Sequence, residues 1–314
     1  MNETRRALLA AFEDGPIAGP ALAERLGISR AAIWKQVEAL RAEGFEIESM
    51  ADGYAVTAVP DYGSAAIEFG LDAPFRVEYH DSIDSTNTRA RELASAGERA
   101  IAVVADEQTG SRGRLSRPWT APSGGIWCSV ILEPEIPAAH VPIVTLAAGV
   151  AAVDACRFAG VDAHLKWPND VLVGESSERG GRKLAGILTE MEGEADRVSW
   201  LLVGIGINAN IDAAALPPDA VSLRELGGDV DRRAIVQKLI ESLTELTAAP
   251  ETVLDRWREY SSTLGQQVRI ETPHETIEGH AVDVQFPGGL VVDTAAGERI
   301  VHAGDCEHLR PKRE

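Results

Sequence analysis

The chain has 314 residues, of which 45% are hydrophobic and 25% are charged, values that exclude a disordered or fibrous protein and suit about two soluble domains. The formal net charge of −19 is unusual, and only five of the 30 basic residues are lysines. Dissolved salt screens the self-repulsion of so acidic a surface, so we expect a halophilic source.

The cysteines and the apolar segments indicate the compartment. Cys128, Cys156 and Cys306 are widely spaced and form no CxxC pair, which argues against a disulfide framework or a zinc site. The longest charge-free apolar run, Val141 to Val153, is shorter than the roughly 20 residues of a membrane span. The apolar run near the first residue is too short for a signal peptide. We expect a cytoplasmic protein with no membrane partner.

Residues 1–60 follow the pattern helix, helix, helix, hairpin. A first helix covers about residues 4–13, a second begins at Pro20, and Ser29 is suited to cap a third. Apolar and polar residues then alternate on both sides of Asp52-Gly53, which is a hairpin signal. This order is typical of the winged helix-turn-helix of DNA-binding proteins.

The third helix would place four side chains in a DNA major groove: Arg30, Trp34, Lys35 and Gln36. Charge argues against tight binding, because residues 1–60 hold six basic and nine acidic residues, a net charge of −3. Two interpretations stay open. Either this module binds DNA, or it is a relic of a DNA-binding ancestor.

Residues 61–74 are rich in glycine and proline and are interpreted as a linker with room for one helical turn. Residues 75–262 alternate strand-like and helix-like segments, which predicts an α/β or α+β domain. We expect strands at 75–80, 101–105, 126–132, 184–191 and 198–207, and helices at 86–95, 141–159, 232–247 and 250–260. Short β-like pieces between turn residues predict a small β-barrel over residues 263–314.

Four segments of the middle domain carry candidate chemistry. The first, Asp84 to Asn87, is typical of a helix N-cap. The second, Glu107 to Trp119, gathers Arg112, Arg114 and Arg117 among glycines and serines. Glycines permit close backbone approach, and arginines bind phosphate or carboxylate oxygens. We expect a mobile loop that orders on an anionic ligand.

The third segment is Lys166-Trp-Pro-Asn-Asp170. It suits either a polar turn between two strands or a site where the Asp170 carboxylate holds magnesium or a ribose hydroxyl. The fourth segment, Gly180 to Leu188, places Lys183 at the start of an apolar strand after a glycine-rich loop. The segment lacks the Gly-Lys-Ser/Thr of a P-loop, yet such a lysine can stabilise charge that develops on a transferred phosphate.

Other catalytic patterns are missing. Residues 204–209 match the loose dinucleotide fingerprint, but Pro217-Pro218 leave no room for the helix that this fingerprint must open. The chain has no GxSxG elbow, and its seven histidines lack metal-ligand spacing. Cys306 and His308 are interpreted as surface residues. The pattern favours phosphate electrostatics over covalent or metal-dependent hydrolysis.

Together these segments resemble the biotin protein ligases, specifically the bifunctional type that also represses a biotin operon. The family's ordered motifs Asp-Ser-Thr-Asn, Gln with an arginine-glycine loop, Lys-Trp-Pro-Asn-Asp, Lys-Leu-Ala-Gly-Ile-Leu and Gly-Ile-Asn occur here between Asp84 and Asn208. The resemblance implies an α+β fold with an N-terminal winged helix-turn-helix. A central mixed β-sheet, similar to that of class II aminoacyl-tRNA synthetases, and a C-terminal SH3-like β-barrel would follow.

The resemblance also implies a reaction. Biotin is activated with ATP, accompanied by Mg²⁺, to biotinyl-5′-AMP, and biotin then passes to a lysine of a biotin carboxyl carrier domain. The implied biotin-binding residues are Ser85, Thr86, Asn87, Gln108, Arg112, Gly113, Arg114, Lys183 and Gly186. The implied ATP-binding or adenylate-binding residues are Arg114, Trp119, Asn169, Lys183 and Asn208. Lys183, Arg114 and Asp170 would be catalytic, and Asn169 and Asp170 are the candidate Mg²⁺ ligands.

One position departs from the family. Its glycine before the first loop arginine is Ser111 here, and a positive φ at this position would strain a serine and alter loop closure.

Three alternatives to a bifunctional ligase stay open: a biotin-sensing repressor without ligase activity, a lipoate ligase on the same fold, and a monofunctional ligase with a relic winged helix. The missing Arg-x-x-Gly-Gly-Gly run argues against the lipoate ligase. The resemblance further implies a homodimer and operator DNA as a partner.

Overall fold

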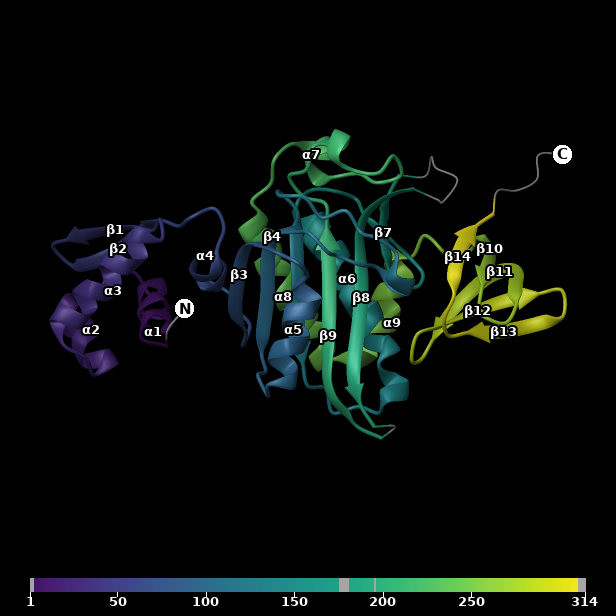
Figure 1. The fold of residues 1–314 in the computed structure, drawn as a ribbon, viewed down its shortest axis with the longest axis horizontal. Coiled ribbons are helices and arrows are strands. Elements are labelled where there is room, and N and C mark those ends of the chain that lie inside the picture. The colour runs from purple at the N-terminus through teal and green to yellow at the C-terminus, as the bar shows by residue number, and fades with distance from the viewer. Residues whose placement is uncertain (1–2, 175–180, 195, 310–314) are drawn as a thin grey trace.

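The computed structural model describes residues 3–174, 181–194 and 196–309. Three regions follow one another along the long axis of the molecule: a helical N-terminal region, a central sheet covered by helices, and a C-terminal sheet (Figure 1). The predicted α+β class is confirmed.

The N-terminal region has the predicted three helices and hairpin. These are α1 (Glu3–Glu13), α2 (Gly19–Leu26), α3 (Arg30–Ala42), β1 (Glu46–Met50) and β2 (Gly53–Ala58). Ser29 caps α3, because its hydroxyl accepts the N–H of Ala32 at 3.2 Å. Gly53 has a φ of +130°, and a side chain there would meet the Ile17 carbonyl oxygen at 2.1 Å. Only glycine therefore closes this hairpin.

The segment predicted as a linker, residues 61–74, contacts both the N-terminal region and the central sheet. It contains the short helix α4 (Ser64–Glu68). The Arg6 guanidinium donates to the Glu68 carboxylate at 2.8 Å, and the same carboxylate accepts the backbone N–H of Val77 at 2.7 Å. The Ser64 hydroxyl accepts the N–H of Tyr79 at 3.1 Å. Side chains of α4 thus satisfy outer amides of the first strand of the central sheet.

The central sheet has seven strands in the order β3-β4-β5-β9-β8-β7-β6. The strands are β3 (Arg76–Ile83), β4 (Ile101–Gln108), β5 (Ile126–Leu132), β6 (His164–Lys166), β7 (Asp170–Val173), β8 (Arg182–Gly193) and β9 (Val198–Ile207). Only β3 and β4 pair in parallel, so the sheet is mixed. The sequence predicted β5 and β9 to the residue. The short strands β6 and β7 are not among the expected strands, but they confirm the interpretation of Lys166–Asp170 as a polar turn between two strands.

Helices cover both faces of this sheet (Figure 1). Helix α5 (Thr86–Ser95) lies on one face, and α6 (Pro142–Phe158), α8 (Arg232–Ala248) and α9 (Val253–Tyr260) lie on the other. The short helix α7 (Leu223–Gly227) and the 3₁₀ turns η1 (Arg114–Ser116), η2 (Ala138–His140), η3 (Ala213–Ala215) and η4 (Pro250–Thr252) complete the chain's helical segments in the described residues.

The segment Ala138–Phe158, which includes α6, is long and apolar enough to cross a membrane by length and composition. However, 72% of its apolar window is buried inside the protein. Asp154 on α6 also accepts hydrogen bonds from Arg256 and Tyr260 of α9. These contacts are those of a core helix.

The C-terminal region is an antiparallel sheet of five strands in the order β13-β12-β11-β10-β14. They are β10 (Gln267–Glu271), β11 (Thr276–Gln285), β12 (Gly289–Thr294), β13 (Gly297–Val301) and β14 (Asp305–His308). The interpretation of Cys306 as a surface residue is wrong, since it is 6% exposed. It lies opposite Ile270 in the pairing of β14 with β10, which directs it into the core.

Candidate active site

The four predicted segments meet in one cavity of about 820 Å³ at the N-terminal end of α5. Every residue predicted to bind biotin or ATP or to catalyse lies in its lining: Ser85, Thr86, Asn87, Gln108, Arg112, Gly113, Arg114, Trp119, Asn169, Asp170, Lys183, Gly186 and Asn208. Residues from Ser85 to Asn208 therefore converge, although 123 positions separate those two in the chain. Gly180 of the fourth segment lies outside the described residues.

One end of the cavity is a continuous hydrogen-bond network. The Gln108 side-chain oxygen accepts both the backbone N–H and the hydroxyl of Thr86, at 2.7 and 3.0 Å. The buried Ser129 hydroxyl lies 2.7 Å from the Thr86 hydroxyl and 2.6 Å from the Asn87 side-chain oxygen. The Asn87 amide nitrogen donates to Glu190 at 3.0 Å. Since the Gln108 oxygen is engaged twice, its NH₂ group is left to donate to a ligand.

Ser85 has the N-cap role that its sequence context predicts. Its hydroxyl oxygen accepts the N–H of Thr88 at 3.4 Å at the start of α5. The hydroxyl proton remains able to donate into the cavity, where Ser85 is part of the lining. Capping and ligand binding are therefore compatible at this residue.

The other end of the cavity is cationic. The Lys183 ammonium lies 2.6 Å from an Asp170 carboxylate oxygen and 4.9 Å from the centre of the Trp119 ring. Gly186 leaves room for this arrangement, because a Cβ there would lie 3.2 Å from the Lys183 side chain and from the Trp119 ring. The ammonium is thus held by an anion and an aromatic face at a position where it faces the cavity.

The arginine loop, which is the second predicted segment (Glu107 to Trp119), links the cationic end of the cavity to the C-terminal sheet. Arg114 donates to the Asn169 side-chain oxygen at 3.0 Å and to the Gly304 carbonyl at 3.1 Å. Arg117 pairs with Asp305. Burial lowers the pKa of the Arg114 guanidinium below its usual value. Arg112 is exposed and lies on the rim.

The strain expected at Ser111 is absent. Among the described residues, a positive φ occurs at non-glycine positions 100, 115 and 116, and Ser111 is not one of them. Its hydroxyl instead donates to the Trp119 carbonyl at 2.7 Å, across the base of the loop. The left-handed residues are Leu115 and Ser116, with φ near +55° and +57°. The loop's constrained backbone therefore lies at its tip, where Leu115 is 79% exposed.

Two buried polar atoms of the lining have no hydrogen-bond partner in the described part of the chain: Trp119 Nε1 and Asn208 Oδ1. The Asn208 amide nitrogen is engaged, since it donates to the carbonyls of Val221 and Lys183 at 3.1 and 3.3 Å. An unsatisfied buried donor and acceptor cost free energy unless a ligand pairs with them. They mark the cavity as a place for a polar ligand.

The residues predicted to bind DNA lie outside the cavity, on α3. Arg30, Trp34 and Lys35 are exposed, with Trp34 58% exposed, whereas the Gln36 side chain accepts from Arg5 at 3.3 Å. Four of the six basic residues in this region form ion pairs: Arg5 with Glu43, Arg6 with Glu68, Arg25 with Asp14 and Arg41 with Glu38. Arg30 and Lys35 have no ion-pair partner among the described residues. The uncompensated positive charge therefore lies on α3.

Sequence reasoning missed Ser129, Glu190, Gly304 and Asp305. A lone hydroxyl in the otherwise apolar strand β5 was a signal for Ser129. Glu190 follows the fourth segment and looks like an ordinary strand residue, while Gly304 and Asp305 lie far from the other motifs. Their contribution depends on tertiary packing.

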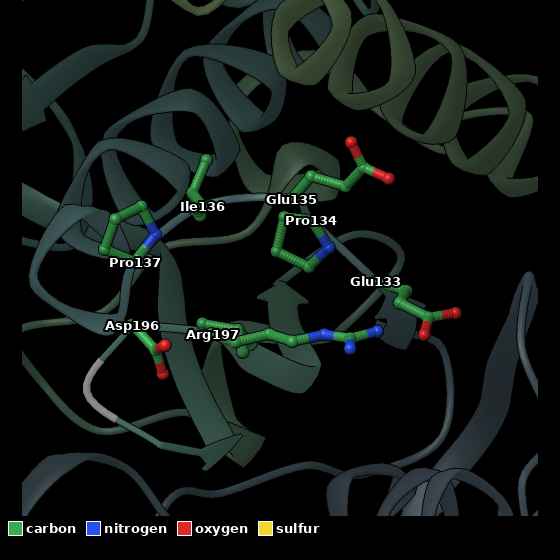
Figure 2. A pocket seen from close by; sticks show the side chains of 8 residues that line it. Glu133, Pro134, Glu135, Ile136, Pro137, Asp196 and Arg197 are labelled. Atoms are coloured by element: carbon green, nitrogen blue, oxygen red, sulfur yellow. The ribbon is translucent and has the colours of Figure 1, made fainter.

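The described residues contain no group of three or more His, Cys, Asp or Glu side chains suited to hold a metal ion. A second cavity of about 770 Å³ lies at the opposite end of β9, lined by Glu133–Pro137 and Asp196–Val198 (Figure 2). None of the predicted site residues belongs to it.

Comparison with known families covers all three regions. Residues 79–208 match the biotin/lipoate A/B protein ligase family. Residues 263–309 match the biotin protein ligase C-terminal domain, and residues 4–55 match an HTH domain. The central match encloses the cavity's four segments.

Similar proteins cover from 70% to 93% of the chain. The bifunctional ligase/repressor BirA of Bacillus subtilis is 36% identical over 310 residues, 93% of each chain. The biotin–(acetyl-CoA-carboxylase) ligase of Mycobacterium tuberculosis is 33% identical over 237 residues, 70% of this chain and 84% of that protein. The solved structure of an Aquifex aeolicus biotin protein ligase with biotin and ATP has a TM-score of 0.64 and 27% identity, covering 75% of this chain and 99% of that one.

Proposed function

Because this chain belongs to the biotin protein ligase family, of the bifunctional ligase/repressor type, we propose that its cavity binds biotin and ATP, forms biotinyl-5′-AMP and transfers biotin to a lysine of a carrier domain. It is a ligase with an N-terminal HTH domain.

One observation carries the proposal. Lys183, Arg114 and Asp170 gather at one end of a cavity whose other end is the network of Gln108, Thr86 and Asn87. A ligand with a hydrogen-bonding head and a carboxylate tail suits this polarity. The cations would hold the carboxylate and the phosphate together, which lowers the barrier by positioning and charge stabilisation.

In the first step, a biotin carboxylate oxygen bonds to the α-phosphorus of ATP, and the bond to the bridging oxygen of pyrophosphate breaks. Negative charge gathers on the α-phosphate oxygens in the transition state. The Lys183 ammonium and the Arg114 guanidinium are the groups that would stabilise it. Trp119 would cover the adenine side, since its ring already packs over Lys183.

In the second step, the carrier lysine attacks the carbonyl of the mixed anhydride. The new bond is an amide, AMP leaves with the bridging oxygen, and the lysine ammonium loses two protons to solvent, one before the attack and one as the amide forms. Asp170 lies at this end of the cavity, where its carboxylate would attract the lysine ammonium and orient it. Neither step needs a nucleophile from the ligase.

Mg²⁺ would enter with ATP as part of the substrate. Asn169 and Asp170 are the oxygen ligands near the cations, but the Asn169 oxygen accepts from Arg114 and Asp170 pairs with Lys183. Two engaged side chains do not make a metal site by themselves, so no step is assigned to a protein-bound metal.

The regulatory half of the proposal is repression through the HTH domain, with operator DNA as the partner. Its support is the exposed, uncompensated pair Arg30 and Lys35 on α3. We further propose a cytoplasmic homodimer. A gel shift with the chain's own upstream DNA, with and without biotinyl-AMP, separates a repressor from a ligase that retains an inactive HTH domain.

Biotin-dependent ATP–pyrophosphate exchange in molar KCl tests the first step. We expect exchange in the wild type and its loss by about two to three orders of magnitude in Lys183→Ala and Arg114→Ala. Lys238→Ala, a change of the same kind on α8, should keep wild-type exchange.

Three other outcomes of the exchange assay would contradict the proposed function. Biotin binding without exchange would mean a sensor that does not ligate. Exchange supported by lipoate in place of biotin would mean a lipoate ligase. Exchange unaffected by both substitutions would mean that the cationic end is not the reaction centre.

A further inference from the structure

The Asn87 side chain is held on three sides by the central sheet. Its oxygen lies 2.6 Å from the Ser129 hydroxyl on β5, and its nitrogen lies 3.0 Å from Glu190 on β8. It packs over Gly204 on β9, where a Cβ would approach its oxygen to 2.2 Å. Both residues that hold Asn87 are more than 40 positions away in the chain.

Strand register places these groups on one face of the sheet. Ser129 pairs with Gly204 across β5 and β9, and Gly204 pairs with Leu188 across β9 and β8. Glu190 is two residues beyond Leu188, so its side chain leaves the same face. The Asn87 amide therefore lies over a glycine, with a hydroxyl on one side and a carboxylate on the other.

Hydrogen-bond chemistry then fixes which way the amide points. A carboxylate only accepts, so the Asn87 nitrogen must face Glu190 and its oxygen must face Ser129. The other carboxylate oxygen of Glu190 accepts from Arg91 at 2.6 Å, one helical turn further along α5. Both oxygens of Glu190 are thus engaged by this chain.

We propose that Glu190 is a positioning residue for biotin recognition, because it fixes the direction of the Asn87 amide and, with it, the direction in which the Ser129 hydroxyl donates. This inference rests on the proposed function. The Asn87 oxygen faces Ser129 and the Gln108 oxygen faces Thr86, whose hydroxyl protons are used inside the network, so the network presents the NH₂ groups of Asn87 and Gln108 to the ligand. Without Glu190 the amide can turn over, and the donor pattern is lost.

Exchanging the amide at position 87 and the carboxylate at position 190 tests whether their hydrogen bond orients Asn87. Asn87→Asp sets two carboxylates against each other, and we expect biotin to bind about a hundredfold more weakly. Glu190→Gln leaves one oxygen for which Asn87 and Arg91 compete, and we expect about a tenfold loss. In the double variant, the amide introduced at position 190 donates to the carboxylate introduced at position 87. Biotin affinity should therefore recover at least about tenfold over Asn87→Asp alone.

Calorimetric biotin titration and steady-state kinetics supply the readouts, with Glu192→Gln as the matched control. Glu192 lies on the same strand, is exposed, and loses the same charge. In Glu190→Gln the KM for biotin should rise while kcat stays near wild type, because the reacting end at Lys183 is unchanged.

The outcomes separate this inference from the proposed function. A wild type that does not bind biotin overturns the proposed function itself. A wild type that binds biotin, together with a double variant no better than Asn87→Asp, overturns the positioning role of Glu190 alone. Equal losses in Glu190→Gln and Glu192→Gln would also reject it, since the effect would then be one of general charge.

Discussion

At position 204, the absence of a side chain decides where the Asn87 amide can lie. Gly204→Ala would place a Cβ 2.2 Å from the Asn87 oxygen, far inside contact distance, so Asn87 must move off its partners. We expect biotin binding to weaken by at least about tenfold while the protein still folds. Equilibrium dialysis with labelled biotin measures the affinity, and far-UV circular dichroism reports the fold.

Gly227→Ala is the control for this prediction. Nothing lies within 4 Å of a Cβ at Gly227, so this substitution should leave biotin affinity unchanged. If Gly204→Ala binds biotin with wild-type affinity, biotin binding does not depend on the observed position of the Asn87 side chain.

Single residues were predictable from the sequence where local chemistry decides their place. Ser85 caps α5 and Ser29 caps α3 because a hydroxyl before a helix can do so in any fold. The partners of Asn87 were not predictable, since Ser129 and Glu190 reach it only through strand order and register.

Strand β14 shows how burial at the element scale produces a pH dependence. Burial, together with the positive charge of Lys166, lowers the pKa of His308 from 6.5 to about 4. Unfolded His308 therefore binds a proton as pH falls through 6.5, whereas folded His308 stays neutral until about pH 4. The free energy of unfolding should decrease as pH falls across this interval, and it should not change above it on account of His308.

Thermal unfolding of His308→Gln checks this prediction. The variant should show a smaller change of Tm between about pH 6.5 and pH 4.5 than the wild type. His274→Gln alters an exposed histidine of the same region and should keep the wild-type slope. If Tm changes equally with pH in all three proteins, His308 makes no contribution.

Whole elements were predictable from the sequence when their apolar pattern extended over seven or more residues. The strands at 126–132 and 198–207 and the helix at 86–95 have the predicted bounds. Strands β6, β7 and β14 have three or four residues each, too few for alternation to show. The contact of the arginine loop with Gly304 joins segments that share no sequence pattern.

For the whole molecule, a net charge of −19 makes salt a stabilising agent. Raising KCl from about 0.1 M to about 3 M shortens the screening length from roughly 10 Å to below 3 Å, so repulsion among the carboxylates should fall. We expect Tm to rise over this range. Sucrose of equal osmolality separates screening from general solute exclusion. An unchanged Tm in KCl would remove the reason to expect a halophilic source.

Helix α4 joins the N-terminal region to the central sheet, so the two are not independent modules. Its side chains cover the outer amides of β3, and Arg6 of the N-terminal region neutralises Glu68, whose side chain is only 5% exposed. Deleting the HTH region would leave that carboxylate without its cation, and deleting α4 as well would uncover a sheet edge that can pair with other chains. In this chain the N-terminal region therefore contributes to the stability of the central sheet, in addition to any role that it has on DNA.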